Sequence, residues 1–98
     1  MGEGLARWFL EGQGLEVIST NLVVDGGEID ILAVDDETRV VVEVRSISGT
    51  GDPINAVSPD KRRRVTQLAS RVGAGRVDFV GIGIGPDAAV IHWVPGRS

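Results

Sequence analysis

Two stretches decide the fold of this chain: GEIDILAV at residues 27–34 and RVVVEVR at residues 39–45. Both are rich in β-branched residues, which predicts two strands. Only a short polar loop separates them, so they are expected to pair as an antiparallel hairpin. Each strand also places an acidic residue in an apolar setting, Asp30 in the first and Glu43 in the second.

The N-terminal elements follow from periodicity. Leu5, Trp8 and Phe9 recur at helical spacing, which predicts a helix over residues 3–13 with these side chains in the core. Glycines follow and end the helix. A mixed apolar segment over residues 15–24 predicts a strand before the hairpin.

The C-terminal half adds one helix and two strands. Ser58 and Pro59 form a helix start, with a hydroxyl cap and proline at the first helical position, and the helix extends to about residue 72. Apolar segments at residues 77–84 and 88–94 predict the last two strands. The order α-β-β-β-α-β-β indicates a single α/β domain over residues 1–98.

The composition excludes several chemistries. The 98 residues include no cysteine and one histidine, which rules out disulfides, thiolate catalysis and histidine-rich metal sites. Any catalysis must therefore use carboxylates, Lys, Arg or hydroxyls. The absence of cysteine fits a reducing cytoplasm, and no apolar run approaches the ~20 residues that span a bilayer, so a cytoplasmic protein without membrane contact is expected.

The net charge of −4 conceals an asymmetry. Residues 1–60 hold three basic and twelve acidic side chains, whereas residues 61–98 hold seven basic and two acidic ones. The run KRRR occupies residues 61–64. This pattern suits a metal site beside a phosphate-binding surface, although two solvated faces would give the same counts.

Three charged residues carry the chemistry of the hairpin. Glu43 and Arg45 share one face of their strand, and hairpin pairing would bring Asp30 beside Glu43. Two adjacent carboxylates repel unless a cation lies between them or one keeps a proton. Their oxygens suit Mg²⁺ or Mn²⁺, and Arg45 would then face a bound phosphate. The alternative is a surface pair of Glu43 with Arg45, with Asp30 capping a turn.

The ordered set of motifs resembles the YraN-like family of restriction-endonuclease-fold proteins. The resemblance rests on residues 27–32 and 41–45, and continues through Asn21, Pro53 and the segment at residues 76–78. The signature is similar to the Asp…Glu-x-Lys arrangement of the PD-(D/E)xK nuclease superfamily, which includes archaeal Holliday junction resolvases. It implies a three-layer α/β fold, with a central mixed sheet of about five strands flanked by helices.

The resemblance also implies roles for individual residues. It makes Asp30 and Glu43 ligands of Mg²⁺ or Mn²⁺, with the Val44 carbonyl completing the protein's contribution. It makes Glu3 an additional acid and Gln67 a polar helix residue that supports the site.

One position departs from the superfamily pattern, because Arg45 stands where a lysine is usual. Arginine keeps its charge and can contact phosphate through two donors, but it cannot act as a general base. Arg45 would therefore orient water or stabilise charge.

The basic helix supplies the expected contact with DNA. Lys61, Arg64 and Arg71 lie roughly on one side of it and would follow a phosphate backbone, unless that side is only solvated. The leading hypothesis is a metal-dependent endonuclease acting on structured or branched DNA. The alternatives are a nucleic-acid-binding module without turnover and a homo-oligomeric interaction protein, for which an edge strand or the surface around Trp93 would serve as the dimer contact.

Overall fold

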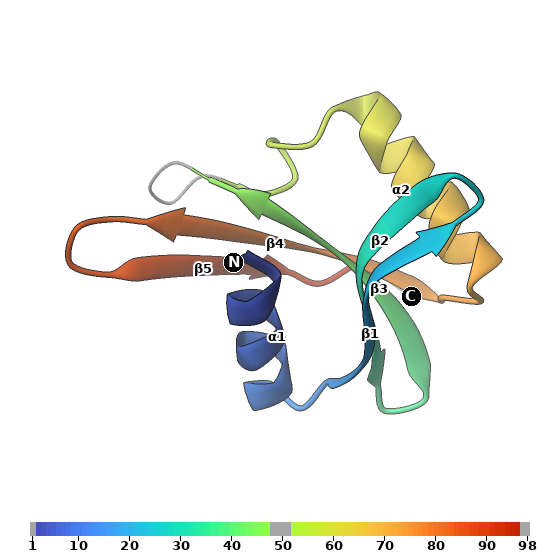
Figure 1. The fold of residues 1–98 in the computed structure, drawn as a ribbon, viewed down its shortest axis with the longest axis horizontal. Helices are drawn as coiled ribbons and strands as arrows, with labels where there is room; N and C mark the ends of the chain where they lie inside the picture. Colours follow the sequence, from blue (N-terminus) through green and yellow to red (C-terminus); the bar gives the residue numbers. More distant parts are fainter. Residues whose placement is uncertain (1, 48–51, 97–98) are drawn as a thin grey trace.

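Five strands form one mixed sheet in the computed structural model of this chain, which describes residues 2–47 and 52–96 (Figure 1). Their spatial order is the same as their order in the sequence. The strands are β1 (Glu16–Val24), β2 (Gly27–Asp35), β3 (Thr38–Ser46), β4 (Arg76–Ile84) and β5 (Ala89–Val94). The predicted α/β class and the predicted order of elements are both confirmed.

The central hairpin forms as the sequence predicts. β2 and β3 pair antiparallel, from Asp35↔Thr38 to Ile31↔Val42. β3 and β4 pair parallel, so the chain after the C-terminal end of β3 must cross back to the side of the sheet where β3 began before β4 starts. Helix α2 (Pro59–Arg71) lies in that return segment. β1 and β5 pair antiparallel with their neighbours and form the two edges.

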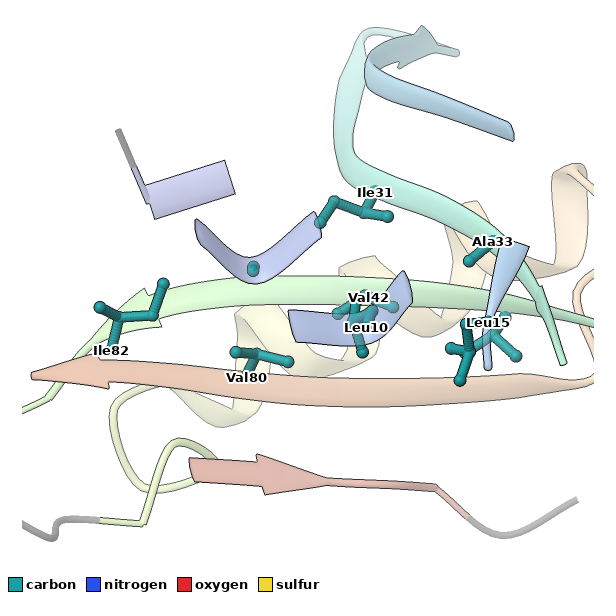
Figure 2. Packing of buried hydrophobic residues seen from close by; sticks show 9 residues of the cluster. Leu10, Leu15, Ile31, Ala33, Val42, Val80 and Ile82 are labelled. Atoms are coloured by element: carbon teal, nitrogen blue, oxygen red, sulfur yellow. The ribbon is translucent and has the colours of Figure 1, made fainter. Parts of the chain in front are cut away.

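Helix α1 (Gly2–Gly12) covers one face of the sheet. Ala6 and Leu10 are fully buried against a cluster that includes Val42 and Val80. Figure 2 shows this cluster between α1 and the strands. The expectation that Trp8 belongs to the core is wrong: its exposed fraction is 69%. The buried stripe follows the small Ala6 side chain, which lets the helix approach the sheet closely and turns Trp8 outward.

Helix α2 covers the opposite face. Val65, Leu68 and Ala69 pack with Ile29 and Val41 in a second buried cluster. The two helices and the sheet therefore form the predicted three layers. Neither helix of the described chain is long and apolar enough to cross a membrane.

The start of α2 is fixed by its cap. The Ser58 hydroxyl accepts a hydrogen bond from the Lys61 backbone N–H at 3.2 Å, and proline occupies the first helical position. The cap satisfies a backbone donor that has no partner within the helix. It also sets where the first turn, with Lys61, lies relative to the end of β3.

Candidate functional site

Asp30 lies where β2 and β3 separate. The ladder between these strands ends at Ile31↔Val42, and beyond it the Val44 N–H donates to Asp30 Oδ2 at 2.8 Å. The carboxylate thus takes the place of a strand-to-strand hydrogen bond. In a strand, the N–H and C=O of one residue point to the same edge, so the Val44 carbonyl also points toward β2.

Glu43 is buried beside Asp30, with an exposed fraction of 1%. Glu43 lies two residues after Val41 in β3, and side chains two apart in a strand point to the same face. Because Val41 packs under α2, the Glu43 side chain is also on the α2 face. Glu43 Oε1 accepts a hydrogen bond from Arg45 Nη2 at 2.6 Å and lies 3.8 Å from Lys61 Nζ. One carboxylate oxygen is therefore shared by two cationic side chains.

Two polar atoms of this group have no hydrogen-bond partner within the described residues: Glu43 Oε2 and Arg45 Nε. Leaving a buried donor or acceptor unpaired costs about 1–3 kcal/mol, so such atoms are rare in folded proteins. Here an acceptor and a donor remain together in one place. The acceptor could bind a divalent cation, and the donor could bind a phosphate attached to that cation.

The titration of Glu43 reflects this setting. Burial and then the neighbouring Asp30 raise the pKa of Glu43 to about 7, while Arg45 and Lys61 act in the opposite direction. The fold therefore disfavours the charged form of Glu43. A bound cation would favour it, because an opposite charge within a few ångströms lowers a carboxyl pKa.

The acid pair opens into a cavity of about 530 Å³. Arg45 and Lys61 also line it, together with Glu28. Sequence reasoning missed Glu28, although it precedes Asp30 by two residues and strand alternation alone would have placed it on the same face. The remaining lining residues are Val44, Ser46, Ile47, Ile82 and Ile84.

The other predicted contacts lie elsewhere on α2. Arg64, Gln67 and Arg71 line a second cavity of about 790 Å³ together with Asp25. Arg64 Nη2 lies 3.5 Å from the Asp25 carbonyl oxygen, and Arg71 Nε lies 3.1 Å from Asp25 Oδ2. This cavity is the larger one, but the paired carboxylates are in the smaller one, where metal chemistry would occur.

The predicted site residues are thus brought together only in part. Asp30, Glu43, Val44, Arg45 and Lys61 share the smaller cavity, and Gln67 lies at the other one. Glu3 is in α1, but its side chain is outside the described part of the structure. Among the described residues, no three His, Cys, Asp or Glu side chains cluster as a metal site.

The donor set nevertheless fits a hard divalent cation. Asp30 and Glu43 offer carboxylate oxygens, one of them buried and without a partner among the described residues. Because the Val44 N–H faces Asp30, strand geometry directs the Val44 carbonyl to the same side. Mg²⁺ commonly binds through one or two carboxylates and keeps several waters, so two protein carboxylates suffice.

Fold and site together define a three-layer α/β protein with an acid pair at the open end of its central hairpin. The chain belongs to the uncharacterised protein family UPF0102, whose family model matches residues 2–82. This confirms the family part of the resemblance.

Relatives at moderate identity cover most of the chain. A UPF0102 protein of Marinobacter nauticus is 36% identical over 103 residues, covering 94% of this chain and 84% of the relative. One of Mycobacterium tuberculosis is 37% identical over 98 residues, covering 88% and 77%. One of Paenarthrobacter aurescens is 42% identical over 71 residues, covering 70% and 59%.

A solved structure, SSO0001, aligns with 98% of this chain and 50% of its own, at 14% identity and a TM-score of 0.48. A likeness of this degree supports no argument about function.

Proposed function

We propose that this protein is a metal-dependent endonuclease of the PD-(D/E)xK type that hydrolyses phosphodiester bonds in structured or branched DNA. The observation that carries the proposal is the unpaired, buried Oε2 of Glu43 beside Asp30. In the metal-free state the two carboxyl groups can share a proton, since burial, the Asp30 charge and a hydrogen bond to Asp30 raise the pKa of Glu43 to about 7. A divalent cation would take the place of that proton.

The ligands of Mg²⁺ or Mn²⁺ in this proposal are Asp30, Glu43 and the Val44 carbonyl, with Glu3 as a candidate additional acid. The ion would polarise the scissile phosphate and lower the pKa of an attacking water. Asp30 is held for this task by the Val44 N–H at 2.8 Å. That hydrogen bond fixes the side chain, because the donor belongs to the backbone of β3.

Arg45 is proposed to bind the phosphate. Its guanidinium already reaches Glu43 Oε1, and its Nε remains without a partner among the described residues. A guanidinium presents paired donors to phosphate oxygens and can offset developing negative charge. Because Arg45 cannot lose its proton, removal of the water proton falls to a carboxylate or to solvent.

DNA would lie along α2. Lys61 is at the acid pair, whereas Arg64 and Arg71 are at the second cavity. Gln67 lies between these two arginines, and its uncharged amide would contact the DNA backbone. Arg71 is ten residue steps after Lys61, which corresponds to about 15 Å along the helix axis. Such a row can contact several phosphates of one strand.

The test is a cleavage assay with purified protein on four-way junction, flap and linear duplex DNA, each in Mg²⁺ and in Mn²⁺. Asp30→Ala should lower cleavage at least about 100-fold, because it removes a metal ligand. Glu37→Ala removes an exposed acid on the β2–β3 turn and serves as the matched control. Absence of any cleavage that depends on both the metal and Asp30 would contradict the proposal.

A second candidate is a nucleic-acid-binding module without turnover. The observation that favours it is Arg45, which replaces the usual lysine and closes onto Glu43 at 2.6 Å. This candidate predicts salt-sensitive DNA binding that charge reversal at Lys61 and Arg64 weakens and that Asp30→Asn leaves unchanged. Metal-dependent cleavage would reject it.

A further inference from the structure

Lys61 differs from Arg63, Arg64 and Arg71, three other basic residues of α2, in what it contacts. The Arg63 guanidinium pairs with Asp60, one turn back on the same helix, and Arg64 and Arg71 meet Asp25 at the far cavity. Lys61 Nζ instead lies 3.8 Å from Glu43 Oε1, inside the cavity of the acid pair. Its location therefore calls for a separate explanation from that of a general DNA-binding helix.

We propose that Lys61 is an exchangeable counter-ion of this site: it neutralises Glu43 when no metal is bound, and it turns to the substrate phosphate when Asp30 and Glu43 bind a divalent cation. The proposal rests on the proposed function, since it requires the acid pair to bind metal. It assigns Lys61 a phosphate-binding role at the reacting centre.

The charges that line the cavity support the exchange. The described lining residues comprise three acids, Glu28, Asp30 and Glu43, and two bases, Arg45 and Lys61. A metal binds the ionised form of Glu43; in that state the lining carries one net negative charge, and a divalent cation would convert it to one net positive charge. That value matches the single negative charge of a phosphodiester group, so metal and substrate together would leave the cavity neutral.

The two basic side chains are not equally able to leave Glu43. Arg45 Nη2 is hydrogen-bonded to Glu43 Oε1 at 2.6 Å, and the Arg45 Nε is buried. Lys61 is beyond hydrogen-bond distance, whereas the exposed fractions of the two side chains are similar, at 39% for Lys61 and 35% for Arg45. Its flexible stem ends in a compact ammonium group that can reorient at little cost. Lys61 is therefore the cation that moves, whereas Arg45 keeps its place.

The backbone supports this movement. The Lys61 N–H is bonded to the Ser58 hydroxyl in the helix cap, so the first turn is held while the side chain remains free to change partner. Pro59 further restricts the backbone at this point. A change of side-chain contact at Lys61 thus requires no movement of α2.

The experiment measures Mn²⁺ affinity by isothermal titration calorimetry in wild type and in Lys61→Met, Lys61→Arg and Arg63→Met. Arg63→Met is the matched control, because it also removes one positive charge from the exposed side of the same helix. Lys61→Met should bind Mn²⁺ about threefold to tenfold more tightly than wild type, because a positive charge a few ångströms from the metal opposes binding. Lys61→Arg and Arg63→Met should stay within about twofold of wild type on the same ground.

A second readout uses DNA binding in Ca²⁺ over a range of salt concentrations. Lys61→Met should bind DNA more weakly, and its slope of log affinity against log salt should fall by roughly 0.9, the value for one lost phosphate contact. A variant that holds metal more tightly and DNA more weakly is the expected signature. The salt slope separates this role from a merely structural one, because a lysine that stays on Glu43 makes no phosphate contact to lose.

Unchanged or weaker Mn²⁺ binding in Lys61→Met, with wild-type binding intact and lost in Asp30→Ala, would overturn the Lys61 proposal and leave the metal site standing. Equal Mn²⁺ binding by wild type and Asp30→Ala would overturn both. Circular dichroism and a thermal melt verify that each variant is folded.

Discussion

Two groups of buried charges lie on opposite faces of the sheet, and they differ in how completely they are hydrogen-bonded. On the α1 face, Asp78 is fully buried and accepts bonds from Arg76 Nε and Nη2 at 2.8 and 3.0 Å, Trp93 Nε1 at 2.9 Å and the Gly96 N–H at 2.8 Å. Arg76 also pairs with Asp35 at 2.9 Å. These interactions raise the pKa of Arg76, with the Asp78 hydrogen bonds contributing most.

On the α2 face, Glu43 is almost as deeply buried, yet one of its oxygens has no partner among the described residues and its pKa is raised to about 7. The Asp78 group joins β4 to β5 and to the segment after β5, so it holds the fold together. The Glu43 group leaves one buried acceptor and one buried donor without hydrogen-bond partners among the described residues, which costs stability and keeps capacity for a ligand. What distinguishes a structural charge from a candidate functional one is how completely it is hydrogen-bonded, more than how deeply it is buried.

The largest expected effect is that of Asp78→Ala. It would leave the Arg76 guanidinium beside Asp35 alone and remove the acceptor of Trp93 Nε1, which should cost about 3–5 kcal/mol of the free energy of unfolding. Urea denaturation followed by circular dichroism measures this loss. Asp87→Ala, at an exposed acid on the β4–β5 turn, is the control and should be near neutral. A loss below about 1 kcal/mol for Asp78→Ala would contradict the structural role of the Asp78 group.

The sequence presents Asp30 and Asp78 alike, as single acids in apolar strands, and cannot tell them apart. That Asp30 lies near Glu43 was predictable because the contact is local: a short turn joins their strands. The partners of Asp78 include Trp93 and Gly96, which reach it only through the pairing of β4 with β5. Whether a buried charge is satisfied depends on such distant contacts.

The same limit explains the other differences between prediction and structure. The seven elements were predictable, because each has clear periodicity and a turn or cap at its ends. The separation of Lys61 from Arg64 and Arg71 depends on how α2 crosses the sheet, which helical spacing does not encode. Trp8 is exposed because the buried stripe of α1 is chosen by packing against β3 and β4.

Glu43→Gln should have the opposite sign and a smaller size. Because the pKa of Glu43 is raised from 4.5 to about 7, its contribution to stability is full below pH 4.5 and is lost as the pH rises through 7. The neutral isostere escapes that loss. We expect metal-free Glu43→Gln to gain roughly 1–3 kcal/mol over wild type at pH 8, since one pKa unit corresponds to about 1.4 kcal/mol.

Thermal melts in EDTA at pH 8 and at pH 5 measure the effect, and the difference should shrink at pH 5. Glu37→Gln, an exposed acid in the β2–β3 turn, controls for the loss of one negative charge. A destabilised Glu43→Gln at pH 8 would mean that the hydrogen bond from Arg45 and the ion pair with Lys61 outweigh burial, and the two groups of charges would then both serve the fold.

The smallest expected effect is that of Trp93→Phe. This change removes the Nε1 hydrogen bond to Asp78 but keeps a ring to pack edge-on against Phe9, whose centroid is 6.1 Å away. Asp78 retains its bonds from Arg76 and Gly96, so the loss should be about 1–2 kcal/mol in urea denaturation. In an Asp78→Asn background the loss should change, because the two residues act through one contact. Mn²⁺ affinity should not change, since the sheet lies between Trp93 and the acid pair. A change in Mn²⁺ affinity would show that the two groups are coupled through β4. The hydrogen bonding of the buried charges on one face of the sheet could then no longer be judged independently of that on the other face.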